Sequence, residues 1–122
     1  MTVVRVIQWI AGIAGLVALV LGLLFWIAQI DLINIHMLFG LTVALALLVL
    51  SIVMVATSGM RVLGAIGIVY AFILPVFGYT QSGILTGSTH WLIQVLHLLV
   101  GLGALALTGI MATRYVRLKR GS

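Results

Sequence analysis

The residues from Leu32 to Thr57 read LINIHMLFGLTVALALLVLSIVMVAT. These 26 consecutive residues contain no Asp, Glu, Lys or Arg. About 20 predominantly apolar residues are enough for a helix to cross the hydrocarbon core of a bilayer. The stretch is therefore predicted to be a transmembrane helix, and its one histidine, His36, would lie within the membrane.

Three more apolar runs flank this stretch, so the chain is predicted to contain four transmembrane helices. Their expected bounds are 6–30, 32–57, 62–79 and 89–113. The connections are short, which makes consecutive helices antiparallel neighbours. The expected fold is all-α, an integral membrane, up-down-up-down antiparallel four-helix bundle. It would form one domain over residues 1–122, with a basic cytoplasmic tail at 114–122.

The composition excludes several classes of protein. The 122 residues are 65% hydrophobic and 6% charged, with a mean hydropathy of +1.44, whereas a soluble domain has about 25% charged residues. A soluble enzyme and a disordered chain are thereby excluded. There is no cysteine, which excludes disulfides, thiolate metal sites, iron–sulfur clusters and covalently attached haem. Asp31 is the only acidic residue, so chemistry based on paired carboxylates is excluded as well.

The basic residues set the expected orientation. If the chain crosses the membrane four times, all six basic residues fall on one side of it: Arg5, Arg61, Arg114, Arg117, Lys119 and Arg120. The positive-inside rule then places both termini in the cytoplasm, and a bacterial plasma membrane is the expected location. Charges divided among three places do not form the basic surface that nucleic acid requires. The expected partner is therefore the lipid bilayer and not nucleic acid.

Three histidines are the candidate functional residues: His36, His90 and His97. An ionisable residue inside a membrane is a functional hypothesis by default. Two of the three share a local pattern, because HMLFGL at 36–41 and HLLVGL at 97–102 both read His, three apolar residues, Gly, Leu. Both copies fall in helices that run from the outside inwards, which indicates a weak tandem repeat of two-helix hairpins.

The glycines of this pattern indicate a planar ligand. Gly40 and Gly101 each follow a histidine by four residues, so each lies on the same helix face as its histidine and leaves a flat gap beside the imidazole. The second and fourth helices would face each other diagonally, so His36 and His97 could bind both axial positions of one haem b iron. Zinc is the weaker alternative, because it prefers three or four ligands in a tetrahedral array.

The fourth helix offers two candidates for the second iron ligand. His97 is favoured because of its glycine and its depth in the membrane. However, His97 lies 17 residues before Arg114, whereas His36 lies 25 residues before Arg61. His90, which lies 24 residues before Arg114, is therefore the alternative axial ligand. Since His90 and His97 share a helix face, the one that does not bind iron could contact a haem propionate.

The surroundings of two of these histidines resemble a known family. His36 within NIHML and His97 within QVLHLL resemble the histidines of the four-helix b-type cytochromes of bacterial membranes, in particular one half of a haem A synthase. The resemblance implies one haem near the outer face. The synthase pattern has a Glu three residues before the first His, where this chain has Ile33, and many synthases have paired cysteines. Haem A synthesis is therefore not expected, and the inner half contains no second histidine pair for another haem.

The function expected from the sequence is single-haem electron transfer by a membrane-embedded b-type haem protein. Six-coordinate iron favours electron transfer over oxygen chemistry, so an electron carrier or a haem-binding subunit is favoured over an enzyme, with a quinol or a redox protein as partner. One alternative is a structural or assembly subunit of a membrane complex. Another is a small multidrug-type transporter, although Asp31 falls in a loop. The protein could also associate into a homo-oligomer.

Overall fold

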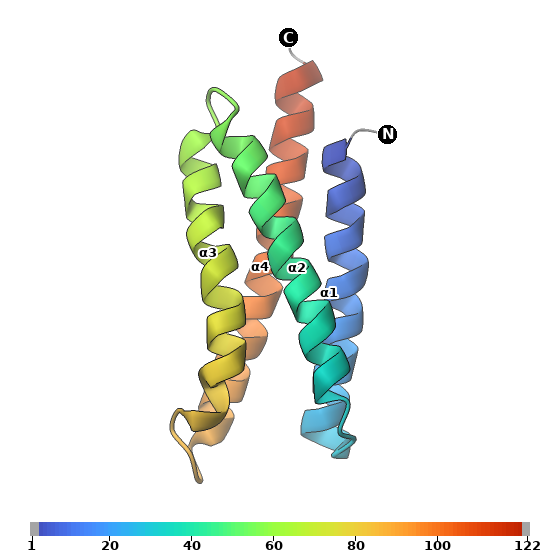
Figure 1. The fold of residues 1–122 in the computed structure, drawn as a ribbon, viewed down its shortest axis with the longest axis vertical. Coiled ribbons are helices and arrows are strands. Elements are labelled where there is room, and N and C mark those ends of the chain that lie inside the picture. Colours follow the sequence, from blue (N-terminus) through green and yellow to red (C-terminus); the bar gives the residue numbers. More distant parts are fainter. Residues whose placement is uncertain (1–2, 121–122) are drawn as a thin grey trace.

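The computed structural model describes residues 3–120, and that part of the chain contains helices and turns but no strand. The elements are α1 (Val3–Ala28), α2 (Ile33–Val55), α3 (Arg61–Thr80), the 3₁₀ turn η1 (Gln81–Gly83) and α4 (His90–Arg120). The predicted all-α class with four long helices is confirmed for these residues (Figure 1). All four helices are long and apolar enough to cross a membrane.

The helix ends lie within three residues of the predicted bounds except at the end of α4. The differences at the ends of α1 and α4 have clear physical reasons. α1 ends at Ala28 because Gln29 adopts a φ of 58°, a left-handed conformation that cannot continue a right-handed helix. α4 continues to Arg120, so the predicted tail is helical over 114–120, and residues 121–122 lie outside the described part. The apolar run ends where contact with lipid is expected to end. The helix continues beyond it because Arg, Lys and Leu are good helix formers. Cations in the last turn of α4 also complement the helix dipole.

The order of the helices in space places the basic residues at one end. The start of α1, the α2–α3 connection and the end of α4 lie together there, and the other two connections lie at the opposite end (Figure 1). Arg5, Arg61 and the basic residues of α4 therefore share one end, and Asp31 lies at the other. α2 packs against each of the other three helices, whereas α1 and α3 do not contact each other over the described residues.

The middle of the bundle is packed around small residues, as in membrane helix interfaces generally. Leu47 and Leu50 of α2 and Met111 of α4 are fully buried. A Cβ atom at Gly67 of α3 would clash with the Ser51 hydroxyl and with Met111. Glycine is therefore needed for α3 to approach α2 and α4 this closely.

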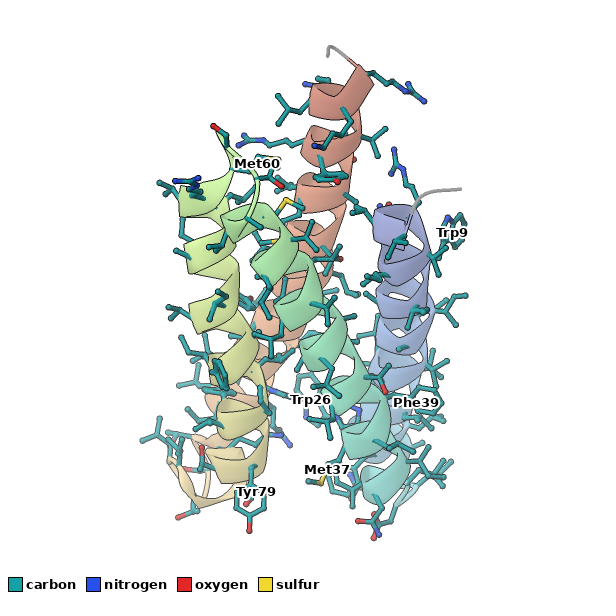
Figure 2. All side chains as sticks on the ribbon, turned by 45° about the horizontal axis from the view of Figure 1, so that its top comes forward. Trp9, Trp26, Met37, Phe39, Met60 and Tyr79 are labelled. Atoms are coloured by element: carbon teal, nitrogen blue, oxygen red, sulfur yellow. The ribbon has the colours of Figure 1, made fainter. Side chains whose placement is uncertain are left out.

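The outer surface is apolar along the length of the bundle. Ile13, Val69 and Phe72 have 59–60% of their surface exposed. Trp9 and Tyr79 are exposed by 60% and 76% and project outward near opposite ends of the molecule (Figure 2), where aromatic residues anchor helices at membrane–water interfaces. Soluble monomers rarely expose apolar surface on this scale, so the surface is consistent with a multi-pass membrane protein.

Candidate functional site

His36 of α2 and His97 of α4 meet near the end of the bundle opposite the basic residues. Their ring centres are 6.1 Å apart, and the ring planes are inclined at 72°. Both side chains are half-buried. The number of residues between each histidine and the next arginine indicated that His36 and His97 lie at unequal depths in the membrane. Such a count assumes that the helices have equal tilts, but α2 is visibly inclined to the other helices (Figure 1). Of the two candidates on α4, His97 is the one that faces His36.

His36 is held in place by the backbone of α1. Its Nδ1 atom lies 2.7 Å from the carbonyl oxygen of Ala18. A carbonyl oxygen can only accept, so Nδ1 carries the proton and donates it, and Nε2 keeps its lone pair. Metal-binding histidines almost always donate their other ring N–H to a carbonyl, a carboxylate or water, which fixes the tautomer and the ring orientation. The orientation of the His36 ring is therefore fixed, and Nε2 is the nitrogen that could accept a hydrogen bond or hold a metal.

His97 has an aromatic neighbour but an unsatisfied nitrogen. Phe77 of α3 stacks on its ring, with ring centres 5.7 Å apart and planes inclined at 13°. The Nδ1 atom of His97 is buried and has no hydrogen-bond partner among the described residues. Leaving a buried polar group unpaired costs about 1–3 kcal/mol, and native proteins pair nearly all such groups. The site therefore contains a polar atom that its own residues do not satisfy.

Two glycines let the histidine rings lie against neighbouring helices. A Cβ atom at Gly22 of α1 would lie 3.1 Å from Cε1 of His36, and one at Gly78 of α3 would lie 3.3 Å from Cε1 of His97. Neither glycine could be predicted from the sequence to lie against a histidine ring, because each contact joins two different helices. One signal was available, since Gly22 follows Ala18 by one turn and continues a ridge of small residues along α1.

The two glycines of the repeated pattern border open space. A Cβ atom at Gly40 or at Gly101 would have no neighbour within 4 Å. Both glycines are half-buried. The α1–α2 pair and the α3–α4 pair diverge toward this end of the bundle (Figure 1), and the side chains of Trp26 and Met37 lie there (Figure 2). At each glycine, the position where a side chain would begin therefore has no neighbouring atom.

The other ionisable residues at this end have local roles. His90 is the first residue of α4, and its Nδ1 atom donates to the carbonyl oxygen of Ile84 over 3.1 Å. Asp31 accepts a hydrogen bond from the amide of Ile33 over 3.3 Å, although Leu32 is the N-cap residue of α2. Across residues 3–120 there is no cluster of three or more His, Cys, Asp or Glu that could hold a metal ion. A zinc site of the usual kind is therefore absent from that range.

Comparisons with protein-family models, with curated proteins and with solved structures found no match to this chain. They give the resemblance to haem A synthases no support, so it stays an expectation from the two histidine stretches. The site is characterised by its own geometry: two facing imidazoles, one oriented by a carbonyl group and one with an unsatisfied nitrogen.

Proposed function

We propose that this protein is a membrane-embedded b-type cytochrome in which His36 and His97 bind the iron of one haem b. The observation that carries the proposal is the 6.1 Å separation of the two imidazole centres. Imidazoles bound on opposite sides of one metal would have centres roughly 6 Å apart, since each metal–nitrogen bond is about 2 Å and a ring nitrogen lies about 1.1 Å from its ring centre.

The residues around the pair fit such a group. Nε2 of His36 has a free lone pair because Nδ1 donates to Ala18. Nδ1 of His97 lacks a partner in the described structure, and a Cβ atom at Gly40 or Gly101, one helical turn from each histidine, would have no neighbour within 4 Å. A bound haem would supply one-electron transfer at a six-coordinate iron. The protein's part is to orient the ligands and to surround the site with apolar side chains.

The same proposal places the chain across a bacterial plasma membrane as an up-down-up-down bundle with both termini in the cytoplasm. It is supported by the four apolar helices and by the gathering of basic residues at one end with Asp31 at the other. The positive-inside rule relates this asymmetry to orientation. The histidine pair then lies in the outer half, within reach of a quinol or a redox partner protein.

Haem stoichiometry in variants tests the ligand assignment. The purified protein is expected to bind one haem per chain, and His36→Ala and His97→Ala are each expected to lose the low-spin spectrum. His90→Ala is the matched control, because His90 donates to a loop carbonyl and does not contact the pair. Normal low-spin haem in either His36→Ala or His97→Ala would overturn the assignment.

A structural subunit is the second candidate, and one observation favours it. The separation and inclination of the two rings also fall within the range of plain edge-to-face aromatic pairs, with centres about 4.5–7 Å apart. If packing is the only role, the wild-type protein should not bind haem when haem is added. A transporter gains no such support, because Asp31 is exposed between α1 and α2.

A further inference from the structure

The two histidines of the pair are oriented by different means. The Nδ1 atom of His36 donates to the carbonyl oxygen of Ala18 over 2.7 Å, which fixes that ring. The Nδ1 atom of His97 is buried and has no hydrogen-bond partner among the described residues. The His97 ring nevertheless faces the His36 ring, with centres 6.1 Å apart. A contact of another kind must therefore orient His97.

α3 supplies this contact through Phe77. The planes of the Phe77 and His97 rings are inclined at only 13°, with centres 5.7 Å apart, which is the offset stacked arrangement that aromatic pairs favour. The next residue, Gly78, lets the backbone of α3 come close, since a Cβ atom there would lie 3.3 Å from Cε1 of His97. Two consecutive residues of α3 therefore confine the His97 ring.

A second contact limits the rotation of α4 against the same face of α3. Tyr70 lies about two helical turns before Phe77, so both side chains lie on one face of the helix. The Tyr70 hydroxyl donates to the carbonyl oxygen of Val100, and a Cβ atom at Gly103 would clash with that hydroxyl. α4 is therefore held against α3 at Val100 as well as at His97, and it cannot turn freely about its axis.

We propose that Phe77 is the positioning residue of His97, and that its ring holds the His97 imidazole across the imidazole of His36. Phe77 thereby does for His97 what the carbonyl group of Ala18 does for His36. It acts through His97 and sets the tilt of that ring, which is inclined at 72° to the His36 ring. The effect on haem binding rests on the proposed function, whereas the orientation of the ring does not.

NMR of the apoprotein in detergent micelles tests the orientation without haem. Isotope-labelled histidine makes the imidazole signals visible, and His90, which donates to the carbonyl oxygen of Ile84, is the internal reference. The site variant is Phe77→Leu, which keeps an apolar side chain but removes the ring, and Phe77→Tyr keeps the ring. Phe72→Leu is the matched control, because Phe72 lies on the same helix with 60% of its surface exposed.

The wild-type apoprotein is expected to show nuclear Overhauser effects from the His97 ring to Phe77 and to His36. Phe77→Leu should weaken or abolish the effect between the two histidines, whereas Phe77→Tyr and Phe72→Leu should keep it. An unchanged effect in Phe77→Leu would overturn the proposal. The absence of any effect between Phe77 and His97 in the wild type would also overturn it, without the need for a variant. Circular dichroism checks that the variants keep their helix content.

The haem-loaded protein tests the consequence for the iron ligand. Two imidazole planes that cross steeply give low-spin ferric iron a highly anisotropic EPR signal, whereas nearly parallel planes give a rhombic signal. The 72° inclination predicts the anisotropic signal for the wild type. Phe77→Leu should change this signal and lower the haem affinity about two- to tenfold, which corresponds to the loss of one aromatic pair. Phe77→Tyr and Phe72→Leu should keep both.

The two proposals fail in different ways. If haem binds but Phe77→Leu leaves both the EPR signal and the haem affinity unchanged, Phe77 does not position the ligand. If the wild-type protein binds no haem, the proposed function fails. The orientation of His97 by Phe77 is then still supported by a contact with His36 that Phe77→Leu removes from the apoprotein and Phe72→Leu does not.

Discussion

If His36 holds the haem iron as proposed, Gly22 should control how tightly it does so. A Cβ atom at this position would lie 3.1 Å from Cε1 of His36, whereas non-bonded carbon atoms prefer about 3.5–4.0 Å. In Gly22→Ala the ring must therefore move by roughly 0.4–0.9 Å, which disturbs its 2.7 Å hydrogen bond to the Ala18 carbonyl group. Loss of such an outer partner typically lowers metal affinity about 10- to 100-fold. For a displaced partner we expect the lower end, about tenfold or about 1.4 kcal/mol.

The assay is haem titration of the apoprotein in detergent, followed by the Soret absorbance. Gly12→Ala is the matched control, because Gly12 lies on the same helix and a Cβ atom there would have no neighbour within 4 Å. Both substitutions gain a similar helix propensity, up to about 1 kcal/mol. A loss of affinity confined to Gly22→Ala therefore reports the displaced ring. Equal haem affinity in the two variants would show that the contact between Gly22 and the His36 ring does not affect haem binding.

Three further predictions concern the rest of the bundle. Gly67→Leu should destabilise the protein by about 1–3 kcal/mol, because the new side chain would overpack against Ser51. Chemical denaturation in detergent would measure the loss, and unchanged stability would contradict the close approach of α3 to α2. Tyr70→Phe should cost about 0.5–1.5 kcal/mol, because the Tyr70 hydroxyl donates to the Val100 carbonyl group; the same denaturation assay applies, and no loss would argue against this bond. His90→Ala should leave the haem spectrum and the haem affinity unchanged, and a shifted α band would instead place His90 at the iron.

The helices could be predicted from the sequence because lipid imposes a simple requirement on length and polarity. The residues from Arg114 to Arg120 show the limit of that requirement. They are too polar for the membrane interior but are good helix formers, so α4 extends past the apolar run. At the end of α1, the apolar Ile30 was predicted to be helical, but the left-handed Gln29 ends the helix first. Hydropathy carries no information about that backbone conformation.

The histidine pair was predictable in part because His36 and His97 stand in the same local pattern. Their surroundings were not predictable, since the carbonyl group of Ala18 and the ring of Phe77 belong to other helices. Which residues meet depends on the rotation of each helix about its axis. In a helix that is apolar on all faces, the sequence pattern does not define that rotation. The small residues of α1 that end at Gly22 are one feature of the sequence that favours a close approach.

Haem binding by His36 and His97 is tested by the absorption spectrum of the detergent-purified protein, oxidised and then reduced with dithionite. Haem b is added if the preparation lacks it. Two axial histidines predict a sharp Soret band and resolved α and β bands on reduction, with one haem per chain. The spectrum should be lost when either His36 or His97 is replaced by alanine. A protein that takes up no haem when excess haem is added would contradict the cytochrome and leave a packing role for the histidine pair.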